Sequence, residues 1–128
     1  MIDDITEDSL LDGRVTLRQP AEGYRAAIDP VLLAAAVPAK SGERVLDLGS
    51  GVGAAALCLS ARLSAVQVTG LDIQAPMVEI ATQNAILNAC GDDVSFVAGD
   101  LLDPPAAVGE DAFDHVMANP PYLGSASG

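Results

Sequence analysis

The chain has 128 residues, enough for one domain or part of one. Half of the residues are hydrophobic and only 3% are aromatic, so a core would be built mostly from aliphatic side chains. The net charge of −12 argues against this chain alone binding the phosphate backbone of a nucleic acid. No apolar run approaches the roughly 18 residues that cross a membrane, and no secretory signal pattern is present. We therefore expect a cytoplasmic protein without a membrane partner.

Residues 1–43 precede the candidate core. Residues 1–11 are acidic and polar, which predicts a loose leader. Residues 14–18 alternate polar and apolar side chains, which predicts a short strand in a hairpin. Asp29 followed by Pro30 predicts a helix start, with Asp at the N-cap and Pro at the first helical position.

The most informative stretch begins at Val45 and contains three glycines at alternate positions, Gly49, Gly51 and Gly53. It predicts a short apolar strand, a glycine-rich turn and a helix running to about Leu63. Glycines in such a turn let the backbone approach a cofactor, and the helix N-terminus presents unpaired N–H groups to a negative group. The same glycines also fit a dinucleotide-binding pattern, and a tight turn without a ligand is the simplest alternative.

Strands and helices alternate after the glycine turn, which implies a parallel sheet with right-handed crossovers. Pro76 opens a further helix, and Asp72 stands about 20 residues after the glycines, where an acceptor for ribose hydroxyls is expected. The later strands are expected at residues 66–71, 94–98 and 113–118.

We expect an α/β fold, a Rossmann-like parallel sheet with helices on both faces that is truncated after the fourth strand. Residues 44–128 would form the cofactor-binding part of a domain whose C-terminal strands are missing. If the first and fourth strands are neighbours, the fourth is an exposed apolar edge. An exposed edge strand of this kind can pair with a strand of a second copy of the chain, which would form an oligomer.

Four signals resemble class I S-adenosylmethionine-dependent methyltransferases. The run Asp47-Leu-Gly49-Ser-Gly51-Val-Gly53 resembles the first motif of that family. Asp72 matches the acid that holds the ribose, and Gly99-Asp100 matches the acid at the adenine amine. Asn119-Pro120-Pro121-Tyr122 resembles the (D/N)PPY motif of amino-methyltransferases.

The resemblance implies S-adenosylmethionine as the cofactor. An acid at Asp47 suits it, because a carboxylate would repel a pyrophosphate but can hold a cationic amino-acid portion. The residues implied to bind the cofactor are Asp47, Gly49, Gly51, Gly53, Asp72, Ile73, Asp100, Leu101 and Asn119. The residues implied to be catalytic are Asn119, Pro120, Pro121 and Tyr122.

The last motif suits methylation of an exocyclic amine, whose lone pair is delocalised into an aromatic ring. Hydrogen bonds from the amine to the Asn119 side-chain oxygen and the Pro120 carbonyl favour a pyramidal nitrogen that aims its lone pair at the methyl group. The prolines fix φ and hold that carbonyl in place. Tyr122 offers a face for a flipped or unpaired base.

Residues 23–33 resemble the segment before the first motif in bacterial tRNA(adenine-N6)-methyltransferases that act on a valine tRNA. This resemblance implies methyl transfer to an exocyclic amine of a nucleobase, with adenine in tRNA as the expected target and RNA as the partner of the intact protein. The alternatives are a protein-glutamine or rRNA-guanine methyltransferase, a dinucleotide-binding oxidoreductase domain, and a cofactor-binding module without catalysis.

Three chemically versatile side chains are expected to be structural. Cys58 and Cys90 lie in no CxxC pattern, which predicts small buried hydrophobes and no metal site. His115 stands among apolar residues of the fourth strand, which predicts a core histidine with satisfied hydrogen bonds.

Overall fold

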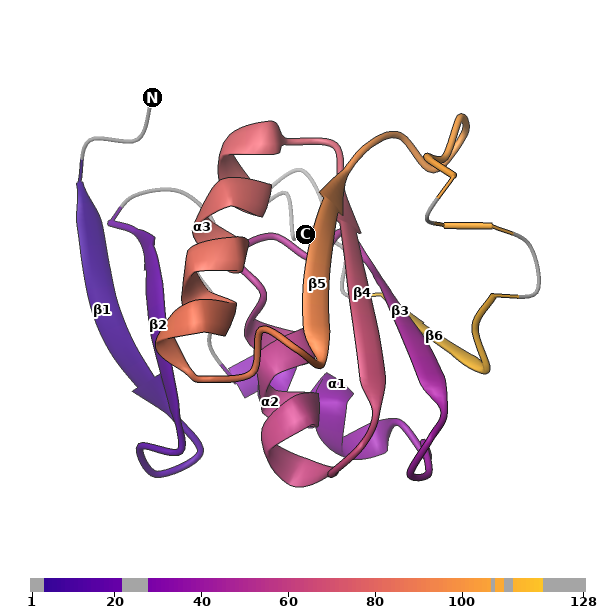
Figure 1. The fold of residues 1–128 in the computed structure, drawn as a ribbon. Coiled ribbons are helices and arrows are strands. Elements are labelled where there is room, and N and C mark those ends of the chain that lie inside the picture. The colour runs from indigo at the N-terminus through magenta and orange to yellow at the C-terminus, as the bar shows by residue number, and fades with distance from the viewer. Residues whose placement is uncertain (1–3, 22–27, 107, 110–111, 119–128) are drawn as a thin grey trace, which may run out of the picture.

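The structure is a computed structural model that describes residues 4–21, 28–106, 108–109 and 112–118. Helices and strands alternate along most of this part of the chain (Figure 1). The elements are β1 (Ile5–Leu10), β2 (Val15–Pro20), α1 (Ile28–Ala36), β3 (Arg44–Leu48), α2 (Ala54–Arg62), β4 (Gln67–Asp72), α3 (Ala75–Leu87), β5 (Val94–Ala98) and β6 (His115–Ala118).

The predicted loose leader is wrong, because β1 pairs with β2 along its whole length in an antiparallel hairpin. Intermediate and exposed side chains alternate along β1, so its acidic residues are those of a half-covered strand rather than a solvated tail. The predicted strand at residues 14–18 is confirmed as the start of β2. The division into residues 1–43 and 44–128 stays a prediction.

The main sheet has four parallel strands in the order β5-β4-β3-β6. The predicted first and fourth strands, β3 and β6, are neighbours, and β6 forms an edge of the sheet within the described residues. Strand β6 begins at His115, two residues later than predicted. Helix α1 begins at Ile28, so Asp29 lies in its first turn rather than at the predicted N-cap.

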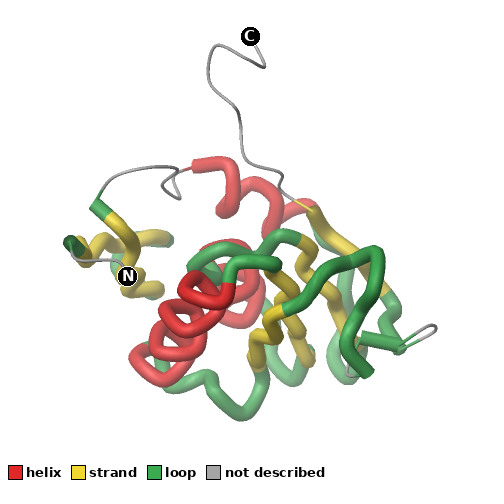
Figure 2. Tube along the Cα trace, turned by 90° about the horizontal axis from the view of Figure 1, so that it is seen from above, coloured by secondary structure: helices red, strands yellow, loops and turns green. Residues whose placement is uncertain are grey.

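All three described helices lie on the same face of the sheet (Figure 2). The β1–β2 hairpin packs on the far side of these helices, so the helices lie between the hairpin and the sheet (Figure 1). The other face packs against the connection between β5 and β6, where Val108 and Phe113 cover Leu46 and Leu71. Helices on both faces were expected; among the described elements the second face has none.

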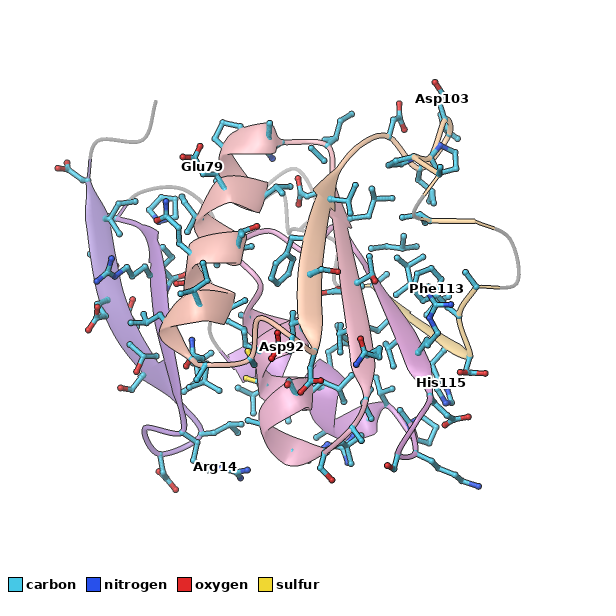
Figure 3. All side chains as sticks on the ribbon, viewed as in Figure 1. Arg14, Glu79, Asp92, Asp103, Phe113 and His115 are labelled. Atoms are coloured by element: carbon cyan, nitrogen blue, oxygen red, sulfur yellow. The ribbon has the colours of Figure 1, made fainter. Side chains whose placement is uncertain are left out.

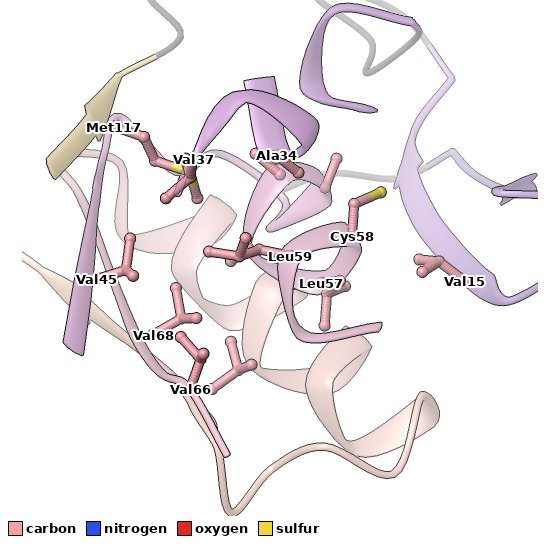
Figure 4. Close-up of a cluster of buried hydrophobic side chains, with 14 of the residues drawn as sticks. Val15, Ala34, Val37, Val45, Leu57, Cys58, Leu59, Val66, Val68 and Met117 are labelled. Carbon is pink, nitrogen blue, oxygen red and sulfur yellow. The ribbon is translucent and has the colours of Figure 1, made fainter. Parts of the chain in front are cut away.

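The principal core lies between the sheet and the helices (Figure 4). Val45, Val68 and Met117 point from three neighbouring strands toward Leu57 and Leu59 of α2. Alternate strand residues face the helices because successive side chains point to opposite faces. The Arg62 guanidinium donates to the carbonyls of Ala34 and Val37 at 2.9 and 2.6 Å, which ties the end of α2 to the end of α1.

Gly70 in β4 allows the closest approach between the sheet and the glycine-rich turn. A Cβ built at Gly70 would lie 2.5 Å from Cδ1 of Phe96 and 2.7 Å from Cβ of Ser50. Phe96 is the neighbour of Gly70 on β5, so its ring fills the space that a side chain on β4 would occupy. The sheet therefore needs glycine at this position for a steric reason.

We predict that Gly70→Ala lowers the free energy of unfolding by roughly 1–3 kcal/mol, the range for overpacking a filled core. Gly91→Ala is the matched control, because a Cβ at Gly91 would meet nothing within 4 Å. Chemical denaturation of both variants measures the difference. Equal stability of the two variants would contradict this packing.

Candidate functional site

The glycine-rich turn joins β3 to α2 in a conformation that L residues with side chains rarely adopt. Gly49, Gly51 and Gly53 have φ values of 68°, 55° and 93°, in the left-handed region that favours glycine. The N–H groups of Gly49 and Ser50 both donate to the Leu71 carbonyl, at 2.8 and 3.1 Å. The turn is therefore fastened to β4, the neighbouring strand.

Open space borders the first two glycines. A Cβ built at Gly49 or Gly51 would meet nothing within 4 Å, whereas one at Gly53 would lie 2.7 Å from Cζ of Phe96. The third glycine thus serves the packing of α2 on β5. The first two leave backbone accessible to a ligand, as the sequence predicts for a cofactor loop.

Asp72 ends β4 and is 9% exposed. Its Oδ2 accepts a hydrogen bond from the Gly51 N–H at 2.8 Å, and its Oδ1 accepts one from the Gln74 N–H at 2.8 Å. Because each carboxylate oxygen can accept more than one hydrogen bond, capacity for hydroxyl donors remains. The role of ribose acceptor stays a prediction; the described contacts show that Asp72 anchors the glycine turn.

Asp47 lies on the neighbouring strand β3, and the residue is 2% exposed. Its Oδ2 and the Ser50 Oγ are buried and have no hydrogen-bond partner among the described atoms. Burial, with a smaller contribution from the charge of Asp72, raises the pKa of Asp47 to about 7. A buried acceptor without a partner is costly, and a cation or donor placed beside it would remove that cost. The residues present therefore fit a ligand with a cationic group.

The other residues predicted to bind the cofactor lie just after the C-terminal ends of β4 and β5. Ile73 comes directly after β4 and is 68% exposed, and Leu101 follows β5 and is 54% exposed. The Gly99 N–H donates to the Asp72 carbonyl at 3.0 Å, which holds the two strand ends together. Two exposed apolar side chains at adjacent strand ends suit a planar apolar group. Asp100 is exposed, and its Oδ1 accepts from the Leu102 N–H at 3.0 Å.

The predicted catalytic residues Asn119, Pro120, Pro121 and Tyr122 lie outside the described residues. The described chain runs to Ala118, which pairs with Leu48. Leu48 directly precedes Gly49, so the described part of β6 ends beside the start of the glycine turn.

His115 is not the core histidine that the sequence predicted. Its Nε2 lies 3.0 Å from Oε1 of Glu43, and its side chain is 24% exposed. The hydrogen bond from His115 is the main cause that lowers the pKa of Glu43. His115 pairs with Val45 near the start of β3, whereas the glycine turn follows Leu48 at the other end of that strand, so the pair of His115 and Glu43 lies away from the turn. Figure 3 shows His115 at the lower end of the sheet, with Asp103 at the upper end.

The other structural expectations have mixed outcomes. Cys58 is a buried thiol whose pKa burial raises to about 11, whereas Cys90 is only half-buried. Within the described ranges, no cluster of three potential metal ligands occurs, and no helix has the length and apolarity needed to span a membrane. A groove of about 340 Å³ between the hairpin and α3 contains none of the predicted site residues.

Two residues that support the turn were missed as contributors to the site. Phe96 packs against Gly53 and Gly70. Asn84 of α3 is fully buried and donates to the Val52 carbonyl of the turn at 2.9 Å. Asn84 is a polar residue on an otherwise apolar helix face, and that signal was available in the sequence.

Two relatives illustrate what the chain is similar to. The tRNA1(Val) (adenine(37)-N6)-methyltransferase of Porphyromonas gingivalis is 33% identical over 118 residues, which cover 88% of this chain and 46% of the relative. The release factor glutamine methyltransferase of Deinococcus radiodurans is 42% identical over 83 residues, which cover 65% of this chain and 28% of the relative. The chain thus spans less than half the length of either relative.

The solved structure of Pyrococcus horikoshii TYW2 in complex with MeSAdo shares the fold, with a TM-score of 0.72 and 21% identity. The match covers 88% of this chain and 41% of that protein. It confirms the Rossmann-like methyltransferase fold. The model of the methyltransferase small domain family matches residues 26–127. The chain therefore belongs to the methyltransferase small domain family.

Proposed function

We propose that the protein containing this chain transfers a methyl group from S-adenosylmethionine to an exocyclic amine of a nucleobase, with adenine in tRNA as the favoured target. The observation that carries the cofactor assignment is the open glycine turn bordered by two acids. Asp47 offers an unpartnered buried acceptor, and Asp72 offers an acceptor fixed at the next strand end. Family membership supports the same cofactor.

The proposed work of each residue follows from its position. Asp47 attracts the cationic amino-acid portion of the cofactor, and the turn at Gly49 and Gly51 lets the backbone approach it. Asp72 accepts hydrogen bonds from the ribose hydroxyls. Ile73 and Leu101 flank the adenine, with Asp100 as the acceptor for its amine. When bound, the cofactor would supply an electrophilic methyl group: the target amine would form a bond to this carbon as its bond to sulfur breaks, S-adenosylhomocysteine would leave, and the amine would release one proton to solvent.

The target amine would be held by the motif that follows β6. We assign the Asn119 side-chain oxygen and the Pro120 carbonyl as acceptors of its two N–H bonds. Both contacts strengthen as the nitrogen becomes tetrahedral, so they stabilise the transition state more than the ground state. The base itself would stack on Tyr122.

The coverage of the relatives favours tRNA over protein as the substrate. The P. gingivalis match leaves out 12% of the 128 residues, about 15, so a continuous match includes most of β2. The D. radiodurans match is 65% of the chain and can omit the hairpin entirely. The P. gingivalis match therefore requires most of strand β2, a part of the hairpin that the D. radiodurans match does not require.

Glutamine methylation is the second candidate, and the charge of the chain favours it. A net charge of −12 gives little attraction for a phosphate backbone. An assay with radiolabelled S-adenosylmethionine separates the two proposals, using unmodified tRNA in one arm and a release factor in the other. Transfer to tRNA alone supports the first proposal, transfer to the release factor alone supports the second, and transfer to neither contradicts both.

Asp72→Ala should weaken binding of S-adenosylhomocysteine by roughly 1.5–3 kcal/mol, the scale of hydrogen bonds to a charged acceptor. The substitution removes the proposed ribose acceptor and the anchor of the Gly51 N–H. Asp92→Ala is the matched control, because it removes the same charge from an exposed residue before β5. Calorimetry measures both, and equal dissociation constants for the two variants would remove Asp72 from the cofactor site.

Asp47→Asn should stabilise the unliganded chain at pH 8 by roughly 2–4 kcal/mol. The pKa of Asp47 is raised to about 7 in the folded chain, so between about pH 4 and 7 the folded state holds a proton that the unfolded state has released, and at pH 8 the folded state bears the full cost of the buried charge. Stability is therefore lost as the pH rises from about 4 to 7, and asparagine avoids that loss.

The difference in free energy of unfolding between Asp47→Asn and wild type should shrink toward zero as the pH is lowered to about 4. At that pH, Asp47 is protonated to a more similar extent in the folded and unfolded wild type. Thermal denaturation across that range provides the measurement. The same variant should bind the cationic cofactor more weakly at pH 8. A stability difference that does not change with pH would contradict the assigned protonation.

Asn119→Ala should slow methyl transfer on the order of 100-fold, the effect of losing one well-placed polar group in a transition state. Binding of S-adenosylhomocysteine should change less than the rate of methyl transfer, because the contact that strengthens in the transition state is to the target amine. Single-turnover kinetics and calorimetry on the same variant separate the two effects. Persistent transfer with collapsed cofactor binding would show that Asn119 has a different role.

A further inference from the structure

Two asparagines, Asn84 in α3 and Asn88 at its C-cap, hold the N-terminal hairpin by hydrogen bonds of the kind that a neighbouring strand would make. Asn84 Oδ1 accepts from the Arg18 N–H at 2.9 Å, and its Nδ2 donates to the Arg18 carbonyl at 2.9 Å. Asn88 Oδ1 accepts from the Thr16 N–H at 2.8 Å, and its Nδ2 donates to the Thr16 carbonyl at 2.7 Å. Each side-chain amide thus satisfies both backbone groups of one β2 residue.

The spacing of the two elements makes this arrangement possible. Four residues of an α-helix rise about 6 Å, and two residues of a β-strand span about 6.7 Å. Asn84 and Asn88, one helical turn apart, therefore match Arg18 and Thr16, two strand residues apart, with the chains running in opposite directions. The hairpin is fixed to α3 in one register.

Each amide makes one further hydrogen bond, and the two differ in where it goes: the Nδ2 of Asn88 also donates to the backbone carbonyl of Asn84 at 2.7 Å, within the helix end. The Nδ2 of Asn84 also donates to the Val52 carbonyl at 2.9 Å. Val52 lies between Gly51 and Gly53 in the glycine turn. Because Asn84 is 0% exposed, no water replaces a hydrogen bond that it loses.

We infer that Asn84 is a positioning residue for the cofactor turn, and that through it the β1–β2 hairpin becomes part of the support of the cofactor site. This inference rests on the proposed function, because it assumes that the ligand binds at the turn. One amide side chain joins three segments: the hairpin at Arg18, helix α3, and the turn at Val52. Asp72 of β4 holds the same turn through the neighbouring residue, by accepting the hydrogen bond from the Gly51 N–H.

The matched pair Asn84→Ala and Asn88→Ala tests the inference. Both substitutions remove two hydrogen bonds to β2, so both should loosen the hairpin and lower the melting temperature. Only Asn84→Ala removes the contact to Val52. We expect the dissociation constant for S-adenosylhomocysteine to rise roughly tenfold in Asn84→Ala, the scale of one buried hydrogen bond, and to change less than about twofold in Asn88→Ala.

Hydrogen exchange supplies a readout without ligand. The Gly51 and Gly53 N–H groups donate to Asp72 and to the Ser50 carbonyl. Their exchange should accelerate in Asn84→Ala and stay as in wild type in Asn88→Ala. Equal exchange of these two amides in both variants would overturn the inference, whether or not the cofactor binds.

If the hairpin supports the cofactor turn, a ligand bound at the turn must stabilise the hairpin by the same free energy. This effect is measured in the wild-type chain, so it does not depend on whether the variants fold. Saturation with S-adenosylhomocysteine should slow exchange of the Arg18 amide more than that of the Arg44 amide, which donates to Asp114 at 2.9 Å. Uniform slowing of both amides would overturn the inference. Absence of any S-adenosylhomocysteine binding by wild type would instead contradict the proposed function.

Discussion

The conformation of the glycine turn depends on the hydrogen bond from the Gly51 N–H to the Asp72 carboxylate. Three residues of the turn have positive φ, a conformation that needs support from its surroundings. Asp72 supplies this support from β4, and the Leu71 carbonyl supplies it to Gly49 and Ser50. The Asp72 side chain holds the turn and can still accept further hydrogen bonds, so it is positioned to contact a ligand bound on the turn.

Side-chain packing restrains the glycine turn further. Phe96 fills the space above Gly70 and meets Gly53, so β5 limits how far the turn can move toward the sheet. Asn84 holds Val52 from the helix side. The open side of the turn lies at Gly49 and Gly51, where an added Cβ would meet nothing. The turn is thus restrained where the protein contacts it and free where a cofactor would lie.

The sequence predicted the parallel sheet and the acid at the end of β4, because each follows from local pattern, whereas the adjacency of β3 and β6 entered the sequence analysis only as a condition. Apolar runs, glycine spacing and a charged residue at a strand end are all visible within a few residues. The pairing of β1 with β2 was missed, since acidic residues in a half-covered strand have the composition of a solvated tail. The contact between Asn84 and Arg18 was out of reach, because it joins residues 66 positions apart.

Every role assigned to the turn requires that S-adenosylmethionine bind on its open side. A nuclear magnetic resonance titration of the wild-type chain with S-adenosylhomocysteine, with NAD as the comparison ligand, locates the bound ligand. We expect saturable shifts in the amides of Gly49, Gly51 and Ile73 with S-adenosylhomocysteine and none with NAD. Shifts confined to the groove lined by Glu7, Arg18 and Gln83, or equal shifts with NAD, would contradict it.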